Sequence, residues 1–348
     1  MPTKLNVNIE QMKLDNLPKP FFVLAPMDDV TDTVFRQIIS NCAPADVYFT
    51  EFVNVDGLQS AGREKLMPKL RFTDKERPLI AQVWGKNPEN FYKTALLITE
   101  LGFDGMDLNF GCPEKNVVRS GVCSAFILPE NRDLAIEIIK ACQRGLVDGA
   151  KIKNDQKSGG DNKNIFTPLP LSVKTRVGFN SVDLTWHELL LNQKLNMLTI
   201  HGRTRKQMSK VPADWEIIGQ VRQLRDKISP ATLIVGNGDV LSRSQGEALA
   251  MQHNLDGVMV GRGIFHDPFV FAHNESGVSP WDTMSKEAKI ALYRKHVELF
   301  AKTWKNNERK LITLNKFCKI YINGFDGAKE LREKLMVCTS ADELLALL

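Results

Sequence analysis

The sequence predicts a (β/α)8 barrel followed by a small helical region. Eight short segments are apolar almost throughout, and helix-length amphipathic stretches lie between most of them. Strands of this kind, alternating with helices, are typical of a parallel sheet whose faces are covered by helices. Eight such units within about 250 residues fit a closed barrel better than an open sheet.

Each predicted strand ends in a polar or glycine-containing turn. In chain order the strands are residues 21–27, 46–52, 78–85, 105–112, 171–178, 197–204, 232–240 and 257–265. Amphipathic stretches at 88–101, 131–144 and 242–253 predict helices between them. The stretch 148–164 is rich in Lys, Asp, Asn, Gly and Ser, which predicts a mobile surface insertion.

After Pro268 the strand pattern stops, and the remaining sequence predicts helices. They are expected over 286–306, 310–323 and 327–338, with a short one from Ser340. We therefore divide the chain into a barrel domain, residues 1–275, and a helical domain, residues 285–348.

The excess positive charge of the chain lies in this last part. Residues 286–348 carry 13 Lys and Arg against 8 Asp and Glu, whereas residues 1–285 carry 33 of each sign. Most such runs are solvated helix surface, but a basic face can also bind a polyanion. The candidate cations, all within 286–319, are Lys286, Lys289, Arg294, Lys295, Lys302, Lys305, Arg309, Lys310, Lys316 and Lys319.

Composition predicts a reduced protein of the cytoplasm. The first seventeen residues mix charged and apolar side chains, unlike a signal peptide, and no stretch of about eighteen apolar residues predicts a membrane helix. The six cysteines show no paired spacing, which argues against disulfides and a zinc site. We expect a monomer with no obligate protein partner and no bound metal.

Polar residues occur at the C-terminal end of nearly every predicted strand, where barrels of this kind place their active sites. Together with the Pro, Met and Gly residues beside them they are, in chain order, Pro26, Met27, Asp28, Glu51, Gln82, Asn109, Cys112, Lys174, Arg176, His201, Arg203, Asn237, Gly238, Asp239, Gly261 and Arg262. A single Lys or His in a strand is more often a satisfied core group. Their convergence at one barrel end favours a site.

The last two strand ends have the form of a phosphate-binding site. Gly236-Asn237-Gly238-Asp239 and Gly261-Arg262-Gly263 would place backbone N–H groups and one guanidinium together. Lys174 would face the same cavity, with Gln82 and Asn109 available for the carbonyl edge of a ring. A flat cofactor that carries a phosphate, such as FMN, fits this arrangement.

The chain resembles the tRNA-dihydrouridine synthase family, in its FMN-dependent bacterial form. The matching stretches run in family order from residue 21 to about residue 270. They are Ala25-Pro26-Met27, Thr31-Asp32, Phe35-Arg36, Asp107-Leu108-Asn109-Phe110-Gly111-Cys112-Pro113, Lys174-Thr175-Arg176-Val177-Gly178, His201-Gly202-Arg203-Thr204, Gly236-Asn237-Gly238-Asp239-Val240 and Gly261-Arg262-Gly263. The resemblance implies an enzyme that reduces the 5,6 double bond of uridine in tRNA, with bound FMN and with NADPH as electron donor.

The resemblance also implies roles for single residues. Cys112 would protonate carbon 5 of uracil, while Asn109 and Arg203 would contact the uracil or its phosphate. The residues that match the flavin site are Pro26, Met27, Gln82, Lys174, His201, Asn237, Gly238, Asp239, Gly261 and Arg262. A thiol with a pKa near its usual value of about 8.5 stays protonated at neutral pH, as a proton donor requires.

Transfer RNA would bind through the basic helical domain, for which we single out four lysines: Lys302, Lys305, Lys310 and Lys316. Because a uracil in folded tRNA is stacked or paired, it must be flipped out to reach a barrel mouth. Contacts to phosphates would offset that cost and make binding depend on salt.

Three positions depart from the family pattern. Asp29 stands where the family usually has Gly, and so does Cys123, which is also a rival thiol to Cys112. Ser209 stands where relatives often carry an aromatic residue. Asp tolerates a left-handed backbone better than most residues, so the turn at Asp29 is expected to form.

Three other functions remain open at this point. The first is an FMN barrel oxidoreductase that acts on a small pyrimidine or similar molecule. The second is an aldolase that forms a Schiff base through Lys174, and the third is a non-catalytic tRNA-binding protein. Flavin absorption in the purified protein would exclude the last two, and tRNA binding would separate the first.

Overall fold

The computed structural model describes residues 14–157, 166–274, 277–305 and 308–348. Its strands are β1 Phe21–Leu24, β2 Val47–Phe49, β3 Val53–Asn54, β4 Leu79–Trp84, β5 Gly105–Asn109, β6 Leu171–Arg176, β7 Met197–His201, β8 Leu233–Asn237 and β9 Gly257–Val260. All eight predicted strands are confirmed. β3 is a two-residue strand that the sequence pattern did not separate.

Eight of the strands form a closed parallel barrel. β1 pairs with β2 and β9, β2 also pairs with β4, and the remaining neighbours follow in chain order from β4 to β9. β3 adds a short parallel pairing at the end of β4. The predicted (β/α)8 barrel is therefore confirmed.

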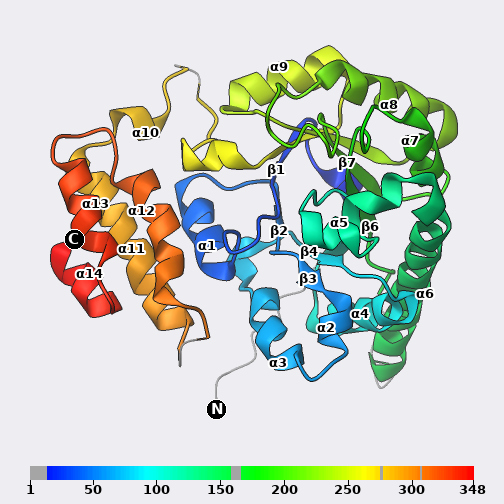
Figure 1. Ribbon diagram of the computed structural model, residues 1–348, viewed down its shortest axis with the longest axis horizontal. Helices are drawn as coiled ribbons and strands as arrows, with labels where there is room; N and C mark the ends of the chain where they lie inside the picture. The colour runs from blue at the N-terminus through cyan, green and yellow to red at the C-terminus, as the bar shows by residue number, and fades with distance from the viewer. Residues whose placement is uncertain (1–13, 158–165, 275–276, 306–307) are drawn as a thin grey trace.

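The barrel is surrounded by helices, and further helices follow it at the C-terminus (Figure 1). The helices are α1 Thr33–Cys42, α2 Val55–Leu58, α3 Arg63–Leu66, α4 Pro88–Leu101, α5 Lys115–Arg119, α6 Arg132–Lys157, α7 Leu184–Leu191, α8 Trp215–Ile228, α9 Arg243–His253, α10 Pro280–Thr283, α11 Lys286–Thr303, α12 Asn315–Tyr321, α13 Ala328–Met336 and α14 Ala341–Leu347. None of the helices in the described ranges is long and apolar enough to cross a membrane.

Alternate strand residues form two separate apolar clusters. One contains Phe21, Val23, Met197 and Met259 with their strand neighbours, and it fills the barrel interior. The other contains the intervening strand residues, such as Phe22, together with the helices. Because side chains alternate along a strand, a residue two or four positions from an interior residue also points inward. This rule decides which polar residues can share the barrel mouth.

The expected insertion at 148–164 is in part wrong. α6 continues through Lys157, so residues 148–157 are helical, and residues 158–165 lie outside the described ranges. The glycines of this helix allow close packing on α4. A β-carbon at Gly145 would lie 2.6 Å from the Tyr92 carbonyl oxygen, and one at Gly149 would lie 2.9 Å from the Thr99 β-carbon. Composition alone suggested a loop, whereas these glycines serve a helix contact.

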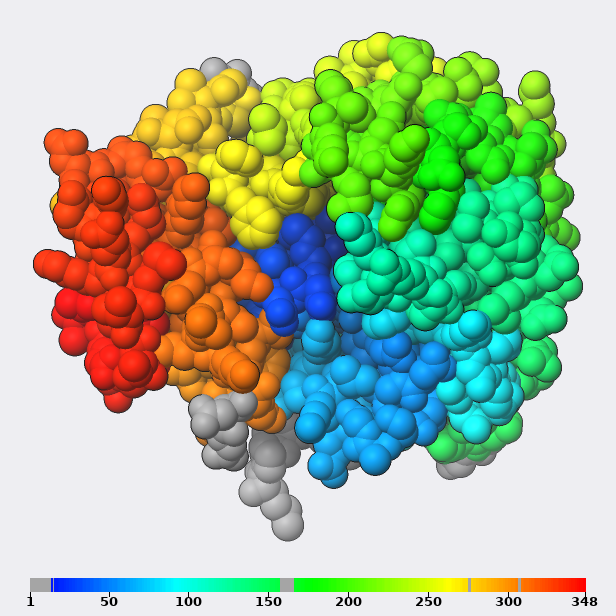
Figure 2. All heavy atoms as spheres, viewed as in Figure 1, coloured from blue at the N-terminus to red at the C-terminus, as the bar shows by residue number. Residues whose placement is uncertain are grey.

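The C-terminal helices pack against the barrel beside α1, on the left of Figure 1, and Figure 2 shows the same contact in space-filling form. The rings of Phe35 in α1 and Phe317 in α12 stack with centroids 5.0 Å apart. Trp304 donates a hydrogen bond of 3.1 Å from Nε1 to Asp32. The predicted helix at 310–323 is a 3-10 turn, Leu311–Leu314, followed by α12. One apolar cluster continues from the barrel helices into this region.

Candidate active site

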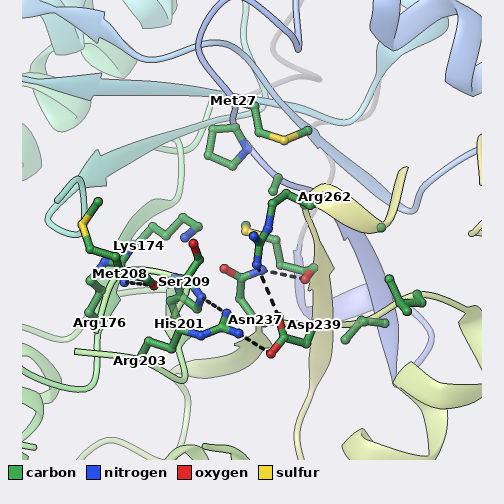
Figure 3. Close-up of a pocket in the computed structure, with 18 of the residues that line it drawn as sticks. Met27, Lys174, Arg176, His201, Arg203, Met208, Ser209, Asn237, Asp239 and Arg262 are labelled. Carbon is green, nitrogen blue, oxygen red and sulfur yellow. Dashed lines mark hydrogen bonds and ion pairs between the residues drawn. The ribbon is translucent and has the colours of Figure 1, made fainter. Parts of the chain in front are cut away.

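A pocket of about 650 Å³ opens at the C-terminal ends of the strands. It is lined by residues at the ends of β6, β7, β8 and β9 and in the loops after β1, β5, β7, β8 and β9. Among these are Pro26, Met27, Lys174, Arg176, His201, Arg203, Met208, Ser209, Asn237, Gly238, Asp239, Gly261 and Arg262. Figure 3 shows Met27 on one side of the space, with Lys174, His201 and Asn237 on the other and Arg262 reaching between them. Nine of the ten residues assigned to the flavin therefore share one pocket.

The pocket carries a strong positive charge. Its lining contains four cationic side chains, Lys174, Arg176, Arg203 and Arg262, and among the described lining residues Asp239 alone is a carboxylate. The Arg262 side chain is 60% exposed, so its guanidinium remains open to a ligand. Like charges in one concave site repel each other and attract an anion. The site is therefore suited to a phosphate.

Asp239 holds two of these cations in place. It forms ion pairs with Arg203 and, at 3.4 Å, with Arg262, and it accepts a hydrogen bond from the Ala213 backbone N–H at 2.9 Å. Arg203 is only 3% exposed, and it also donates to the Val211 carbonyl and to Nε2 of His201. The dashed contacts in Figure 3 show this arrangement. The Asp239 side chain therefore orients the arginines.

The turn after β8 offers backbone donors. Gly238 has φ 135° and Asp239 has φ 57°, a left-handed turn that turns the chain sharply after the strand. The backbone N–H groups of Gly238 and Asp239 have no acceptor among the residues the structure describes. A β-carbon at Gly261, on the neighbouring loop, would meet only Ala25 within 4 Å, so the space beside it is open. Free donors beside an open space are what a bound phosphate requires.

Lys174 and His201 face the pocket from adjacent strands. Burial, followed by the nearby Arg176 charge, lowers the pKa of Lys174 to about 8. At neutral pH the ammonium group is therefore mostly charged. Burial, with Lys174, Arg176 and Arg203 close by, also lowers the pKa of His201 far below its usual value. The imidazole is therefore neutral, and its Nε2 accepts a hydrogen bond of 3.2 Å from Arg203.

Gln82 and Asn109 do not line the pocket, contrary to the expectation that they are free for a ring edge. Gln82 Nε2 donates a hydrogen bond of 2.7 Å to Asp107, and Gln82 Oε1 accepts one of 3.1 Å from Asn109. Asp107 also accepts a hydrogen bond from Ser172, and burial raises the pKa of its carboxyl to about 6. These side chains form a hydrogen-bonded network in which the Lys174 charge acts on Asp107, so both amides are already oriented within the protein.

Cys112 lies in the turn after β5, next to Pro113, which lines the pocket. Asn109 Oδ1 accepts hydrogen bonds from the backbone N–H groups of Gly111 and Cys112, at 3.1 and 3.0 Å, which fixes this turn. The thiol of Cys112 is half-buried, and the Cys123 thiol lies close enough to stabilise its thiolate. The rival thiol therefore contacts the candidate acid.

The expectation that Cys112 keeps an ordinary pKa is wrong. The hydrogen bond with Cys123 is the largest cause of a pKa lowered to about 7, and the Glu114 backbone N–H and Arg176 act in the same direction. Burial raises the pKa of Cys123 instead, so Cys123 remains the protonated donor. The sequence noted Cys123 as a rival thiol, but spacing could not show that the two sulfur atoms meet.

Both positions where a glycine was expected have left-handed backbones. Asp29 has φ 56° and Cys123 has φ 55°. The turn at Asp29 forms as predicted, and the Glu51 carboxylate accepts its backbone N–H at 2.7 Å. Ser209, the third departure, lines the pocket.

The basic tail divides into exposed and internal cations. Lys302, Lys305, Lys310 and Lys316 are exposed, and Lys316 donates 2.9 Å to the carbonyl of Asp29. Arg309, also a candidate, is only 10% exposed. It binds both oxygens of the buried Glu51 at 2.8 and 3.0 Å and also pairs with Asp32 and Asp29. Arg309 therefore anchors the tail to the barrel and does not belong to the basic surface.

Sequence reasoning assigned no role to two residues of the site. Arg176 lines the pocket and donates 2.7 Å to the Gly111 carbonyl, beside Cys112. Asp107 holds Gln82 and faces the same interior as Lys174. Arg176 lies two positions from Lys174 in β6, and Asp107 lies two positions from Asn109 in β5, so each points to the same side of its strand as the residue already noted. This spacing was the signal that could have found them.

Comparisons with known proteins identify the family of the chain. The model of the dihydrouridine synthase (Dus) family matches residues 23–348. A protein of Staphylococcus aureus (strain COL) named "Probable tRNA-dihydrouridine synthase" is 43% identical over 335 residues, covering 95% of this chain and 93% of that protein. "Probable tRNA-dihydrouridine synthase 2" of Bacillus subtilis (strain 168) is 43% identical over 336 residues, covering 95% and 94%.

Among solved structures, histamine dehydrogenase from Rhizobium sp. 4-9 matches with a TM-score of 0.55 at 14% identity. The match covers 80% of this chain and 48% of the dehydrogenase, so this chain spans about half of that protein. This likeness concerns the barrel fold. The family match and the 43% identical relatives, which extend over nearly the whole chain, establish that this protein belongs to the dihydrouridine synthase family.

Proposed function

We propose that this protein reduces the 5,6 double bond of uridine in tRNA, with FMN as bound cofactor and NADPH as electron donor. The observation that carries the proposal is the cationic pocket at the strand ends, which adjoins the Cys112 turn in a chain of this family. Uridine in tRNA is taken from the names of the 43% identical relatives. NADPH as the electron donor, a monomeric state and a cytoplasmic location are inferred with it from family resemblance and composition.

The residues at the pocket fit FMN. Arg262 and the backbone N–H groups of Gly238 and Asp239 would bind its phosphate, because they are cationic or unpaired donors in one open space. Lys174 would face the electron-rich part of the ring, and Met27 would border it from the opposite side, with Pro26 as a further residue of the lining. When bound, reduced FMN supplies the hydride of the reaction.

Cys112 would supply the proton. Its thiol is half-buried in the turn beside the pocket, and Asn109 fixes that turn through two backbone hydrogen bonds. With a pKa of about 7, the thiol is protonated in about half of the molecules at neutral pH. Arg203 is proposed to orient the uracil or its phosphate from the pocket wall, and Asn109 is proposed to act on the substrate through the Cys112 turn that it fixes.

The helical region, residues 285–348, is proposed to bind the body of the tRNA beside the catalytic barrel, residues 1–275. Lys302, Lys305, Lys310 and Lys316 are exposed, and Arg309, which lies between them in the sequence, attaches this part of the region to the barrel. Contacts from these lysines to phosphates would offset the cost of flipping out a uridine.

The first experiment separates proton delivery from electron delivery. Cys112→Ala should purify with flavin and accept electrons from NADPH, yet fail to form dihydrouridine in tRNA. Dihydrouridine is measured by mass spectrometry of nuclease digests, and flavin reduction by the loss of its visible absorption. Full activity in Cys112→Ala, with loss of activity in Cys123→Ala, would overturn the roles given to these two thiols.

The second experiment tests the phosphate site. Arg262→Ala should remove a charge-assisted hydrogen bond worth about 1.5–3 kcal/mol, which weakens FMN binding by about ten- to a hundred-fold. Binding of FMN to the apoprotein is measured by fluorescence quenching, and Arg243→Ala, on the outer helix α9, is the control. Equal FMN affinity in Arg262→Ala and in the parent would count against this placement.

The third experiment tests tRNA binding. Replacing Lys302, Lys305, Lys310 and Lys316 together by Gln should weaken tRNA binding and flatten its salt dependence. The slope should fall by about 0.7–0.9 log units per decade of salt for each phosphate that the variant no longer neutralises. The control replaces four exposed barrel lysines by Gln: Lys93, Lys140, Lys151 and Lys227. Salt slopes equal to those of the parent would show that the basic face is only solvated surface.

A further inference from the structure

Two loops bring the thiols of Cys112 and Cys123 into contact beside the pocket. Cys112 follows β5, and Cys123 begins the 3-10 turn Cys123–Ile127 after α5. The Ser124 backbone N–H donates 3.4 Å to the Cys112 carbonyl, which joins the two loops at this point. The Cys123 thiol lies near both the thiol and the backbone of Cys112, close enough for the two residues to shift each other's pKa. Backbone and side-chain contacts therefore place both sulfur atoms together.

The other four cysteines are placed differently. Cys142 is buried in α6, and Cys318 lies beside the Tyr293 hydroxyl. Cys338 follows the end of α13 and donates a hydrogen bond to the carbonyl of Lys334 in that helix. Cys42 lies in α1 against the C-terminal helices. Of the six cysteines, the structure joins only Cys112 and Cys123, all six lying within its described ranges.

The two thiols also differ in the way that a redox pair requires. Cys112 is half-buried at the edge of an open pocket, so a small oxidant can reach it. The Cys123 thiol and the Arg176 charge both stabilise the thiolate of Cys112. The thiolate is the form that attacks a peroxide. Cys123 is buried and protonated, in contact with the sulfur that would be oxidised.

We propose that Cys112 and Cys123 form a reversible disulfide when the protein meets hydrogen peroxide. The Cys112 thiolate attacks one peroxide oxygen, the O–O bond breaks, and with one proton the products are a sulfenic acid and water. The Cys123 thiol then attacks the Cys112 sulfur, the S–O bond breaks, and a second water leaves. In total, two thiols lose two electrons and two protons, and one peroxide becomes two waters.

The disulfide would remove the S–H group assigned to proton delivery. A dithiol reductant restores both thiols by exchange. The disulfide also protects Cys112 from further oxidation. A sulfenic acid without a neighbouring thiol is oxidised to a sulfinic acid, which dithiol reductants do not reverse. The effect on uridine reduction rests on the proposed function, whereas formation of the disulfide does not.

The test is chemical and is made on the full-length protein with its thiols reduced. After treatment with a small excess of hydrogen peroxide and alkylation, the intact protein should have lost two hydrogen atoms and have two alkylation sites fewer. Peptide mapping should find residues 112 and 123 joined, and dithiothreitol should separate them. The control Cys338→Ala should form the same disulfide. Oxidised Cys112 beside a freely alkylated Cys123 would overturn the proposal.

A second variant, Cys123→Gly, tests whether the disulfide protects Cys112 from irreversible oxidation. Cys123→Gly should form no disulfide, and its Cys112 should proceed to sulfinic acid. Oxidised parent should regain uridine reduction after dithiothreitol, whereas oxidised Cys123→Gly should not. Equal recovery in both proteins would overturn the protective role. If the disulfide forms but even the reduced parent never reduces uridine, then the proposed function has failed and the redox pair stands.

Discussion

The contact between Cys112 and Cys123 makes a quantitative prediction about pH. Replacing Cys123 by Gly removes the S–H group that stabilises the Cys112 thiolate, which is the largest cause of its lowered pKa. Glycine also suits the left-handed backbone at this position, where φ is 55°. The change therefore removes one hydrogen bond without demanding a new backbone conformation.

The size of the effect follows from the strength of that bond. A hydrogen bond to a charged group contributes about 1.5–3 kcal/mol, and one pKa unit corresponds to about 1.36 kcal/mol. The pKa of Cys112 is about 7 in the parent, so it should rise by about one to two units in Cys123→Gly. Because the protonated thiol is the active form, uridine reduction should fall as pH rises through about 7 in the parent. In the variant it should fall about one to two units higher.

The assay is single-turnover oxidation of the prereduced enzyme by tRNA, followed by flavin absorption between pH 6 and pH 9. At pH 8 the variant should react about five-fold faster than the parent or more, and near pH 6 the two rates should converge. The Lys174 ammonium, with a pKa of about 8, contributes to the alkaline limb of both proteins, so the difference between them reports on Cys112. Cys338→Ala is the control. Superimposable profiles for parent and Cys123→Gly would refute the reasoning.

The remaining predictions concern stability. Arg309→Met should lower the free energy of unfolding in urea by about 3–5 kcal/mol, because it leaves the buried Glu51 carboxylate with Lys69, 3.9 Å away, as its remaining counter-charge. The exposed control Lys305→Met should change the free energy of unfolding by less than about 0.5 kcal/mol. Equal urea midpoints for the two variants would show that Arg309 does not anchor the tail. Lys194→Gly should raise the free energy of unfolding by at most about 1 kcal/mol, since Lys194 is exposed with φ 55°. A lower urea midpoint in Lys194→Gly would contradict this account.

The sequence by itself determined the barrel and most of the pocket. Strand periodicity is local, so Lys174, His201 and Asn237 could be placed on inward positions at strand ends before the barrel was seen. Barrel closure then brings all strand ends to one mouth, whatever the loops between them do. This is why nine of the ten residues expected at the flavin site line one pocket.

Only the tertiary structure decided which side chains meet. The thiol contact of Cys112 and Cys123, the amide network that engages Gln82, and the burial of Arg309 against Glu51 all join separate elements. The glycines that let α6 pack on α4 belong to the same class, because composition does not show what lies opposite a glycine. Periodicity fixes the direction of a side chain, whereas its partner, and hence its pKa and exposure, depends on contacts between distant segments.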